Sequence, residues 1–263
     1  MIKRRQTLVL TVLRWTTTLA IIGSHTALAE EVSVAVASNA LQAVNEIKKQ
    51  FEKTTGNRVL VSSGSTGKLY TQIVNGAPYD IFMAANSREP ERLEKGNAII
   101  PGTRMTYAKG RLVLWRHASA NATANPESLR NYLDSANFNR LTLANPKTAP
   151  YGYAAQEFLI HEKIWNQIQS KLIRAENVTQ AFQYIQSQNA DLGFVAYSQI
   201  KAYTKPADGS SYWLVPENLY TPINQQAVLL KHAQGNLAAR EFMNYLSSPK
   251  IVKLLKDNYG YGV

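Results

Sequence analysis

The chain has 263 residues, with 29 Lys and Arg against 18 Asp and Glu, and a formal net charge of +11. It contains no cysteine, which excludes disulfides, thiol nucleophiles and thiolate metal sites. The basic residues form no dense run, so the charge indicates a dispersed, solvated surface and no nucleic-acid partner.

The N-terminal segment has the pattern of a secretory signal peptide. It has a basic start at residues 3–5 and an apolar run that Arg14 interrupts, and it ends in the small-residue sequence Ala-Leu-Ala at Ala29. The run is too short and too broken for a membrane-spanning helix. We therefore predict a signal peptide over residues 1–29, cleaved after Ala29. Its four basic residues account for the difference between +11 and a charge of +7 for the mature chain.

Strands and helices alternate in the first part of the mature chain. The predicted order is a strand at 32–37, a helix at 40–54, a strand at 58–62, a helix containing Leu69, Ile73 and Val74, and a strand at 81–84. This βαβ pattern implies parallel pairing. In such sheets ligands bind beyond the carboxyl ends of the strands.

Small polar residues follow two of these strands at that edge. Ser38 and Asn39 follow the first strand, and Ser65 and Thr66 follow the second. The first N–H groups of a helix lack partners within it, and the helix dipole adds a partial positive charge there. With hydroxyl donors beside them, such helix starts bind an anion without a charged side chain. The same residues also suit simple turns and helix caps, and this alternative stays open.

The rest of the chain repeats this alternation of strands and helices and then returns to the first part of the fold. Further predicted strands lie at 112–115, 141–144, near 173, 192–196, 212–215 and 224–230, and helices at 88–95, 126–133, 152–161, 164–172, 178–187, 236–246 and 250–258. Two more helix starts, at Tyr151 and Val178, follow strand ends. We predict a first lobe of residues 30–112 plus 228–263 and a second lobe of 113–227. The two chain crossings between them imply a hinge.

The motifs in this order resemble those of the periplasmic molybdate-binding proteins of molybdate ABC transporters. The resemblance covers nearly all of the mature chain, and it lies in the segments 35–39, 64–73, 76–82, 143–152, 176–178 and 192–195. It implies the type II periplasmic-binding-protein fold, an α/β fold with two lobes. Each lobe is then a mixed, mainly parallel sheet flanked by helices, and two crossing strands form the hinge. It also implies a periplasmic monomer that takes no cofactor, binds molybdate or tungstate and delivers it to an inner-membrane ABC permease.

The resemblance also implies which residues contact the oxyanion. They are Ser38, Asn39, Thr66 and the main-chain N–H groups of Tyr151 and Val178, with Ser65 replacing Thr66 if the register shifts by one residue. None of these positions is Lys, Arg, Asp or Glu. Molybdate and tungstate are fully ionised near neutral pH, so a set of N–H and O–H donors matches them. The same donors would hold the metal only as its oxyanion, and no site for a bare metal ion is expected.

Some members of that family add a tyrosine hydroxyl after the strand at 192–196. Here that position is Ala196, and Tyr197 follows it. In a continuing strand, Tyr197 would face the opposite side of the sheet. We therefore expect a site without a tyrosine ligand.

The sequence leaves three alternative functions. The chain would bind another tetrahedral oxyanion such as sulfate or phosphate if the cavity had a different size, or would act as an oxyanion sensor if its partner were a receptor. A secreted hydrolase is the third, but His161-Glu162 lacks the second histidine of a zinc-protease helix, and no Gly-x-Ser-x-Gly elbow is present.

Overall fold

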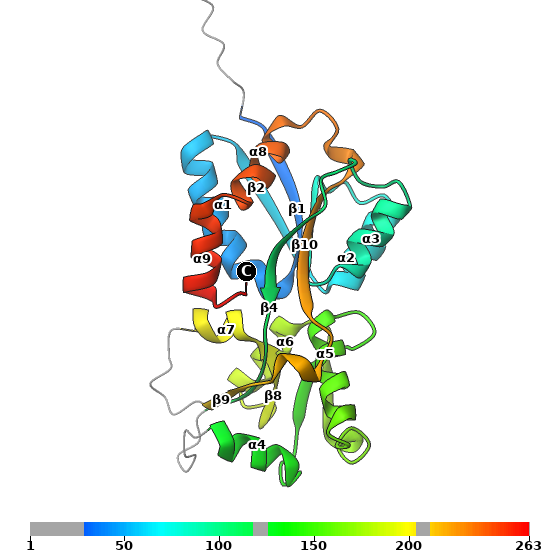
Figure 1. Ribbon diagram of the computed structural model, residues 1–263, viewed down its shortest axis with the longest axis vertical. Helices are drawn as coiled ribbons and strands as arrows, with labels where there is room; N and C mark the ends of the chain where they lie inside the picture. Colours follow the sequence, from blue (N-terminus) through cyan, green and yellow to red (C-terminus); the bar gives the residue numbers. More distant parts are fainter. Residues whose placement is uncertain (1–28, 118–125, 204–210, 263) are drawn as a thin grey trace, which may run out of the picture.

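The protein consists of two lobes stacked along its long axis, each built on a five-stranded sheet (Figure 1). The computed structural model describes residues 29–117, 126–203 and 211–262. The predicted signal peptide lies outside these residues except for Ala29. None of the helices in the described part of the chain is long and apolar enough to cross a membrane. The predicted two-lobed α/β fold is confirmed.

The first lobe holds a sheet with the strand order β2-β1-β3-β10-β4. Its strands are β1 (Glu31–Ala37), β2 (Arg58–Gly64), β3 (Ile81–Ala84), β4 (Met105–Gly110) and β10 (Ile223–Leu229). Its helices are α1 (Leu41–Thr55), α2 (Thr66–Val74), α3 (Arg88–Lys95), α8 (Leu237–Leu246) and α9 (Pro249–Tyr259). β1 pairs in parallel with both β2 and β3, whereas β10 runs antiparallel to β3 and β4. The carboxyl ends of β1, β2 and β3 therefore meet at one edge.

Helices cover both faces of this sheet. α1, α8 and α9 lie on one face and α2 and α3 on the other (Figure 1). In α1, Val44, Ile47 and Phe51 recur at helical spacing and are buried, because they form the stripe that faces the sheet. Phe51 meets Phe242 of α8 edge to face, with ring centroids 5.1 Å apart. The C-terminal helices thus pack on the first lobe, as predicted.

The second lobe repeats this arrangement with the strand order β7-β6-β8-β5-β9. Its strands are β5 (Leu112–Arg116), β6 (Leu141–Ala144), β7 (Leu172–Ala175), β8 (Leu192–Ala196) and β9 (Ser211–Leu214). Its helices are α4 (Pro126–Asp134), α5 (Pro150–His161), α6 (Val178–Gln186) and α7 (Tyr197–Ala202). β6 pairs in parallel with β7 and β8, and β5 runs antiparallel to β8 and β9. The carboxyl ends of β6 and β7 face the first lobe.

The chain crosses between the lobes at two points. β4 belongs to the first sheet and β5 to the second, and only Arg111 separates them. The return is made by β10, which pairs with β3 and β4 from Ile223 onward. The sequence placed Leu112 in the first lobe and residues 223–227 in the second, and the strand pairing corrects both. β4 was not predicted, since its sequence has no alternating apolar pattern.

One predicted helix in the second lobe is wrong. Residues 164–172 were expected to form a helix, but they form turns, a short 3₁₀ segment at Gln169–Lys171 and the start of β7. Lys163 has a positive φ of 62°, which ends α5 and turns the chain. The strand predicted at 192–196 is β8, and α7 begins directly after it at Tyr197.

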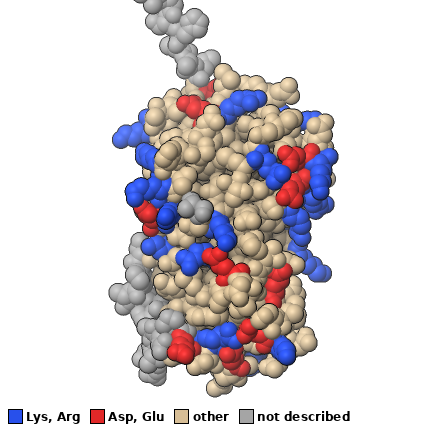
Figure 2. Space-filling model, viewed as in Figure 1, with Lys and Arg blue, Asp and Glu red and all other residues tan. Residues whose placement is uncertain are grey.

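The charged residues are spread over the surface. On the face shown in Figure 2, basic and acidic side chains are intermixed on both lobes. Several charged residues of the described chain form ion pairs, such as Arg104 with Glu94 at 2.7 Å and Lys109 with Glu217 at 2.5 Å. The charge pattern of this face fits the predicted dispersed surface.

Candidate functional site

Four helix starts, two from each lobe, surround one small cavity between the lobes. It holds all six residues that the sequence singled out. The lining residues are Ala37, Ser38, Asn39, Gly64, Ser65, Thr66, Ala85, Ala149, Pro150, Tyr151, Asn177 and Val178. Its volume, counting the open mouth, is about 190 Å³. The cavity lies where the carboxyl ends of β1, β2, β6 and β7 meet, because the parallel strands direct their following helices to these edges.

The first lobe contributes hydroxyl groups. Ser38 begins a 3₁₀ turn directly after β1, and it makes no side-chain cap to α1. Ser65 precedes α2 and also makes no cap bond, and its Oγ is buried without a partner among the described residues. The Oγ1 of Thr66 accepts the N–H of Ala85 at 3.0 Å, so its own proton is free to be donated. Ser65 and Thr66 therefore both remain candidate donors.

Hydrogen bonds fix the side chain of Asn39, and its main-chain N–H is the group suited to bind a ligand. Its Nδ2 donates to Gln225 Oε1 at 2.9 Å and to the hydroxyl of Tyr261 at 3.1 Å, which uses both hydrogens. Its Oδ1 is buried with no partner in the described structure. A fully ionised oxyanion has no proton to donate to that oxygen. In this arrangement Asn39 is therefore suited to bind an anion through its main-chain N–H.

The second lobe contributes main-chain N–H groups. Tyr151 and Val178 stand in the first turns of α5 and α6, where N–H groups have no acceptor inside the helix. The side chain of Asn177 accepts the N–H groups of Thr179 and Gln180, as expected for a cap, and leaves that of Val178 unused by the cap. Glycine is required at 152, since a Cβ there would lie 2.0 Å from the carbonyl oxygen of Ala144.

The side-chain hydroxyl of Tyr151 is not one of the donors proposed for the anion. It lies near Gln225 in the hinge, and burial, with further contributions from neighbouring tyrosines, raises its pKa well above the ordinary value of 10. It therefore stays neutral under physiological conditions. No Lys, Arg, Asp, Glu or His is among the described residues that line the cavity. Its positive potential comes from helix ends and oriented N–H groups.

Polar contacts join the two lobes around the cavity. They are Gly67 N–H to Thr148 O at 2.8 Å, Thr179 Oγ1 to Ser38 O at 3.1 Å, Ser198 Oγ to Asn39 O at 3.1 Å, and the ion pair of Lys68 with Glu176 at 2.8 Å. These contacts describe a closed cleft. The sequence reasoning missed them, because no local pattern shows which residues of one lobe will face the other.

Tyr197 takes no part in the cavity. Its ring lies under the guanidinium of Arg111, 5.2 Å from it, and against the backbone of Gly260. Because α7 begins at Tyr197, the alternation of side chains along a strand does not apply to this residue, but Tyr197 still does not line the cavity.

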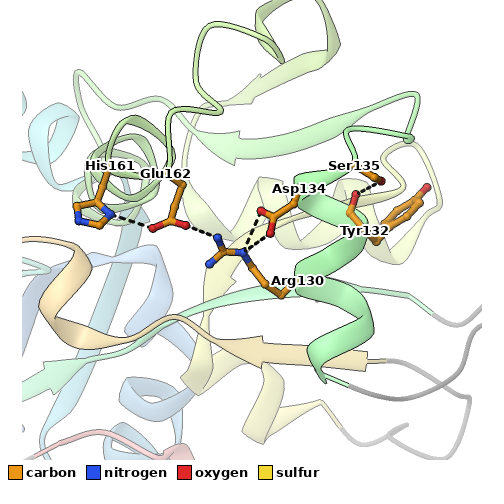
Figure 3. A network of polar contacts seen from close by, with 6 residues as sticks. All are labelled: Arg130, Tyr132, Asp134, Ser135, His161 and Glu162. Atoms are coloured by element: carbon orange, nitrogen blue, oxygen red, sulfur yellow. Dashed lines mark hydrogen bonds and ion pairs between the residues drawn. The ribbon is translucent and has the colours of Figure 1, made fainter.

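The His161-Glu162 pair belongs to a separate network at α4 and α5 (Figure 3). His161 Nδ1 lies 2.8 Å from Glu162, Glu162 pairs with Arg130, and Arg130 pairs with Asp134 at 3.0 Å. Burial alone would raise the pKa of Glu162, but the hydrogen bonds from His161 and Arg130 outweigh it and lower the pKa. Within the described ranges, no group of three or more His, Asp or Glu residues is placed to hold a metal ion. The network is an ion-pair cluster that ties α4 to α5.

A family model described as bacterial extracellular solute-binding protein matches residues 32–262. The chain belongs to this family. The match covers both lobes of this solute-binding protein and every residue of the cavity, and it places the chain among binding proteins rather than enzymes.

Relatives of this solute-binding protein include two proteins named molybdate-binding protein ModA. The one from Azotobacter vinelandii is 43% identical over 235 residues, covering 89% of this chain and 91% of the relative. The one from Rhodobacter capsulatus is 36% identical over 235 residues, covering 89% of each. The solved structure of the Azotobacter vinelandii periplasmic molybdate-binding protein superposes with a TM-score of 0.80 and 36% identity, covering 88% of this chain and 99% of that one.

Proposed function

We propose that this protein captures molybdate, and tungstate by the same donors, in the cavity between its lobes. The observation that carries the proposal is the composition of that cavity. It is enclosed by four helix starts, two from each lobe, and by small hydroxyl residues of the first lobe, with no charged side chain among its described lining residues. The names of the ModA relatives supply the identity of the oxyanion.

The proposed contacts are the hydroxyls of Ser38 and Thr66, with Ser65 as the alternative, and the main-chain N–H groups of Asn39, Tyr151 and Val178. A hydrogen bond to a charged group contributes about 1.5–3 kcal/mol. Several such bonds, less the costs of closing the lobes, leave about 8 kcal/mol, which corresponds to micromolar affinity. The donors come from both lobes, so the oxyanion stabilises the closed state over the open one.

Selection among oxyanions follows from protonation and size. The proposed contacts are all donors, and none of them accepts the proton that hydrogen phosphate carries, so this set of contacts disfavours hydrogen phosphate. Sulfate is fully ionised like molybdate, but its S–O bonds are shorter than Mo–O bonds. A rigid ring of donors matched to the larger anion would leave some bonds to sulfate stretched.

The route of export and delivery is also part of the proposal. Family membership makes the protein extracellular in the broad sense. We propose that residues 1–29 are removed as a signal peptide, that the mature chain works as a monomer in the periplasm, and that its closed form docks on an inner-membrane ABC permease. The basic start of residues 1–29 and their Ala-Leu-Ala end support the first of these steps.

Titration calorimetry of the mature protein tests the ligand assignment. Sodium molybdate and sodium tungstate are expected to bind with micromolar or tighter affinity and one-to-one stoichiometry, and sulfate and phosphate much more weakly. Equal, weak heats from all four anions would refute the proposal. Tight binding of sulfate or phosphate with no response to molybdate would replace it with a different oxyanion.

Single hydroxyl deletions test the assignment of the site. Ser38→Ala and Thr66→Ala should each weaken molybdate binding about tenfold or more. Thr54→Ala is a matched control, because that hydroxyl bonds only the carbonyl of Gln50 on α1. If Thr66→Ala binds as tightly as the wild type while Ser65→Ala does not, the register shifts by one residue.

A further inference from the structure

Gln225 occupies an unusual position in the hinge. It lies in β10, the strand by which the chain returns to the first lobe, next to a β-bulge between Gln225 and Gln226. Its side chain is 0% exposed. A buried carboxamide needs partners for both its oxygen and its nitrogen, so its surroundings define how it is used.

The partners of Gln225 include one residue from each half of the cavity. Its Oε1 accepts from Asn39 Nδ2 at 2.9 Å and from the Tyr107 hydroxyl at 2.8 Å. Its Nε2 donates to the Tyr151 hydroxyl at 3.4 Å, the longest of the three contacts. Asn39 stands at the helix start after β1, and Tyr151 at the start of α5. One side chain thus links the two lobes directly behind the cavity.

The surrounding chain leaves room for this link. A Cβ at Gly110, at the end of β4, would lie 2.3 Å from the Tyr151 hydroxyl and 2.8 Å from Gln225 Nε2. On the other side, the Tyr261 hydroxyl contacts the Asn39 side chain at 3.1 Å and donates to its main-chain oxygen at 3.2 Å. Asn39 is therefore fixed by side chain and main chain together.

We propose that Gln225 is a positioning residue that aligns the two halves of the oxyanion site when the lobes close. This rests on the proposed function. Gln225 does not line the cavity, and its effect is transmitted through the residues it bonds. Anchoring the Asn39 carboxamide orients the turn that presents the Asn39 N–H, and the bond to Tyr151 sets the distance of the first turn of α5 from that turn.

The neighbouring glutamine provides a matched control. Gln226 is also buried, at 8% exposed, but its side chain accepts from Arg104 at 3.2 Å and donates to Thr106 at 3.1 Å, and both partners belong to the first lobe. Gln225→Met and Gln226→Met remove the same group from adjacent positions. Titration calorimetry with sodium molybdate should show about a tenfold loss of affinity for Gln225→Met and less than a twofold change for Gln226→Met.

Tyr151→Phe examines the link between lobes separately, since it leaves the main-chain N–H of residue 151 in place. It should weaken molybdate binding about two- to threefold, in keeping with the longer contact. In the double variant with Gln225→Met this extra loss should vanish, because the bond is already gone. That coupling is a readout that a purely structural role would not produce. If Gln225→Met does not fold, the loss caused by Tyr151→Phe alone decides.

The outcomes separate this inference from the proposed function. If the wild type binds no oxyanion, the proposed function is wrong. If the wild type binds molybdate and folded Gln225→Met binds it equally well, or loses no more than Gln226→Met, Gln225 does not position the site. Strictly additive losses for Gln225→Met and Tyr151→Phe would likewise overturn the inference.

Discussion

Gly67 is a position where the stability of the ligand-free protein and its affinity should change in opposite directions. It lies in the first turn of α2, and its N–H donates to Thr148 O of the other lobe at 2.8 Å. A Cβ at Gly67 would lie 3.0 Å from that oxygen and 3.1 Å from the Cα of Thr148. The lobes must therefore separate by a few tenths of an ångström in Gly67→Ala. Because the clash lies between lobes, opening the cleft relieves it completely.

The magnitudes follow from this geometry. Weakening one hydrogen bond between the lobes costs about 0.5–1.5 kcal/mol, which lowers molybdate affinity about 2- to 12-fold. Alanine is a better helix former than glycine by up to about 1 kcal/mol, so the ligand-free protein should unfold at a temperature about 1–3 °C higher. Calorimetry measures the first effect and thermal unfolding without ligand the second.

Gly96→Ala serves as the control for Gly67→Ala. Gly96 ends α3 with a φ of −79°, and its nearest contact, Arg92 O at 3.2 Å, lies in its own helix. Its affinity for molybdate should match the wild type. The reasoning is refuted if Gly67→Ala binds molybdate as tightly as the wild type, or if its ligand-free form unfolds several degrees lower.

Three further changes probe other parts of the molecule. Lys68→Met removes the ion pair with Glu176, and both side chains of this pair are half exposed. The molybdate affinity of the variant should therefore fall no more than about fivefold at low salt and match the wild type at 0.5 M salt. A difference in affinity that stays the same at high salt would contradict this. Glu162→Gln removes a carboxylate whose folded pKa is lowered, so the variant should be less stable than the wild type to urea at pH 7. The difference in stability between wild type and variant should shrink as the pH falls below about 4.3 and passes through the folded pKa of Glu162. A difference in stability that grows in acid would mean that folding does not lower this pKa. Phe51→Ala should lower the free energy of unfolding by about 3–5 kcal/mol, measured by urea denaturation, without changing the affinity of the folded protein; a loss under 1 kcal/mol would mean that the core closes around the gap.

The parts of the fold that the sequence predicts are those set by local periodicity. The alternation in β1, the buried stripe of α1 and the helix starts after four strands are all readable because each follows from neighbouring residues. β4 is different, since its sequence, Met-Thr-Tyr-Ala-Lys-Gly, has no period of two. It is a strand because β10 pairs with it, and β10 lies more than a hundred residues later in the chain.

In the candidate site, too, some residues can be predicted from the local sequence and others cannot. Ser38, Thr66, Tyr151 and Val178 can be placed from strand–helix boundaries and from a resemblance, and the structure brings all four together with Asn39 and Ser65. The side-chain partners of Asn39 cannot be placed in this way. They stand 186 and 222 residues away, and only the closed arrangement of both lobes makes them neighbours.

The uncharged cavity wall has a consequence for how the cargo leaves. Among the described residues around it, only Tyr151 has a group that loses a proton, and the pKa of that phenol is raised well above 10. A mild fall or rise in the surrounding pH therefore does not change the charge of the cavity wall, and it cannot release the bound anion through the protein. Release of the anion then requires the two lobes to be separated by the protein that receives it. The energy needed to separate the lobes sets how fast the anion is released.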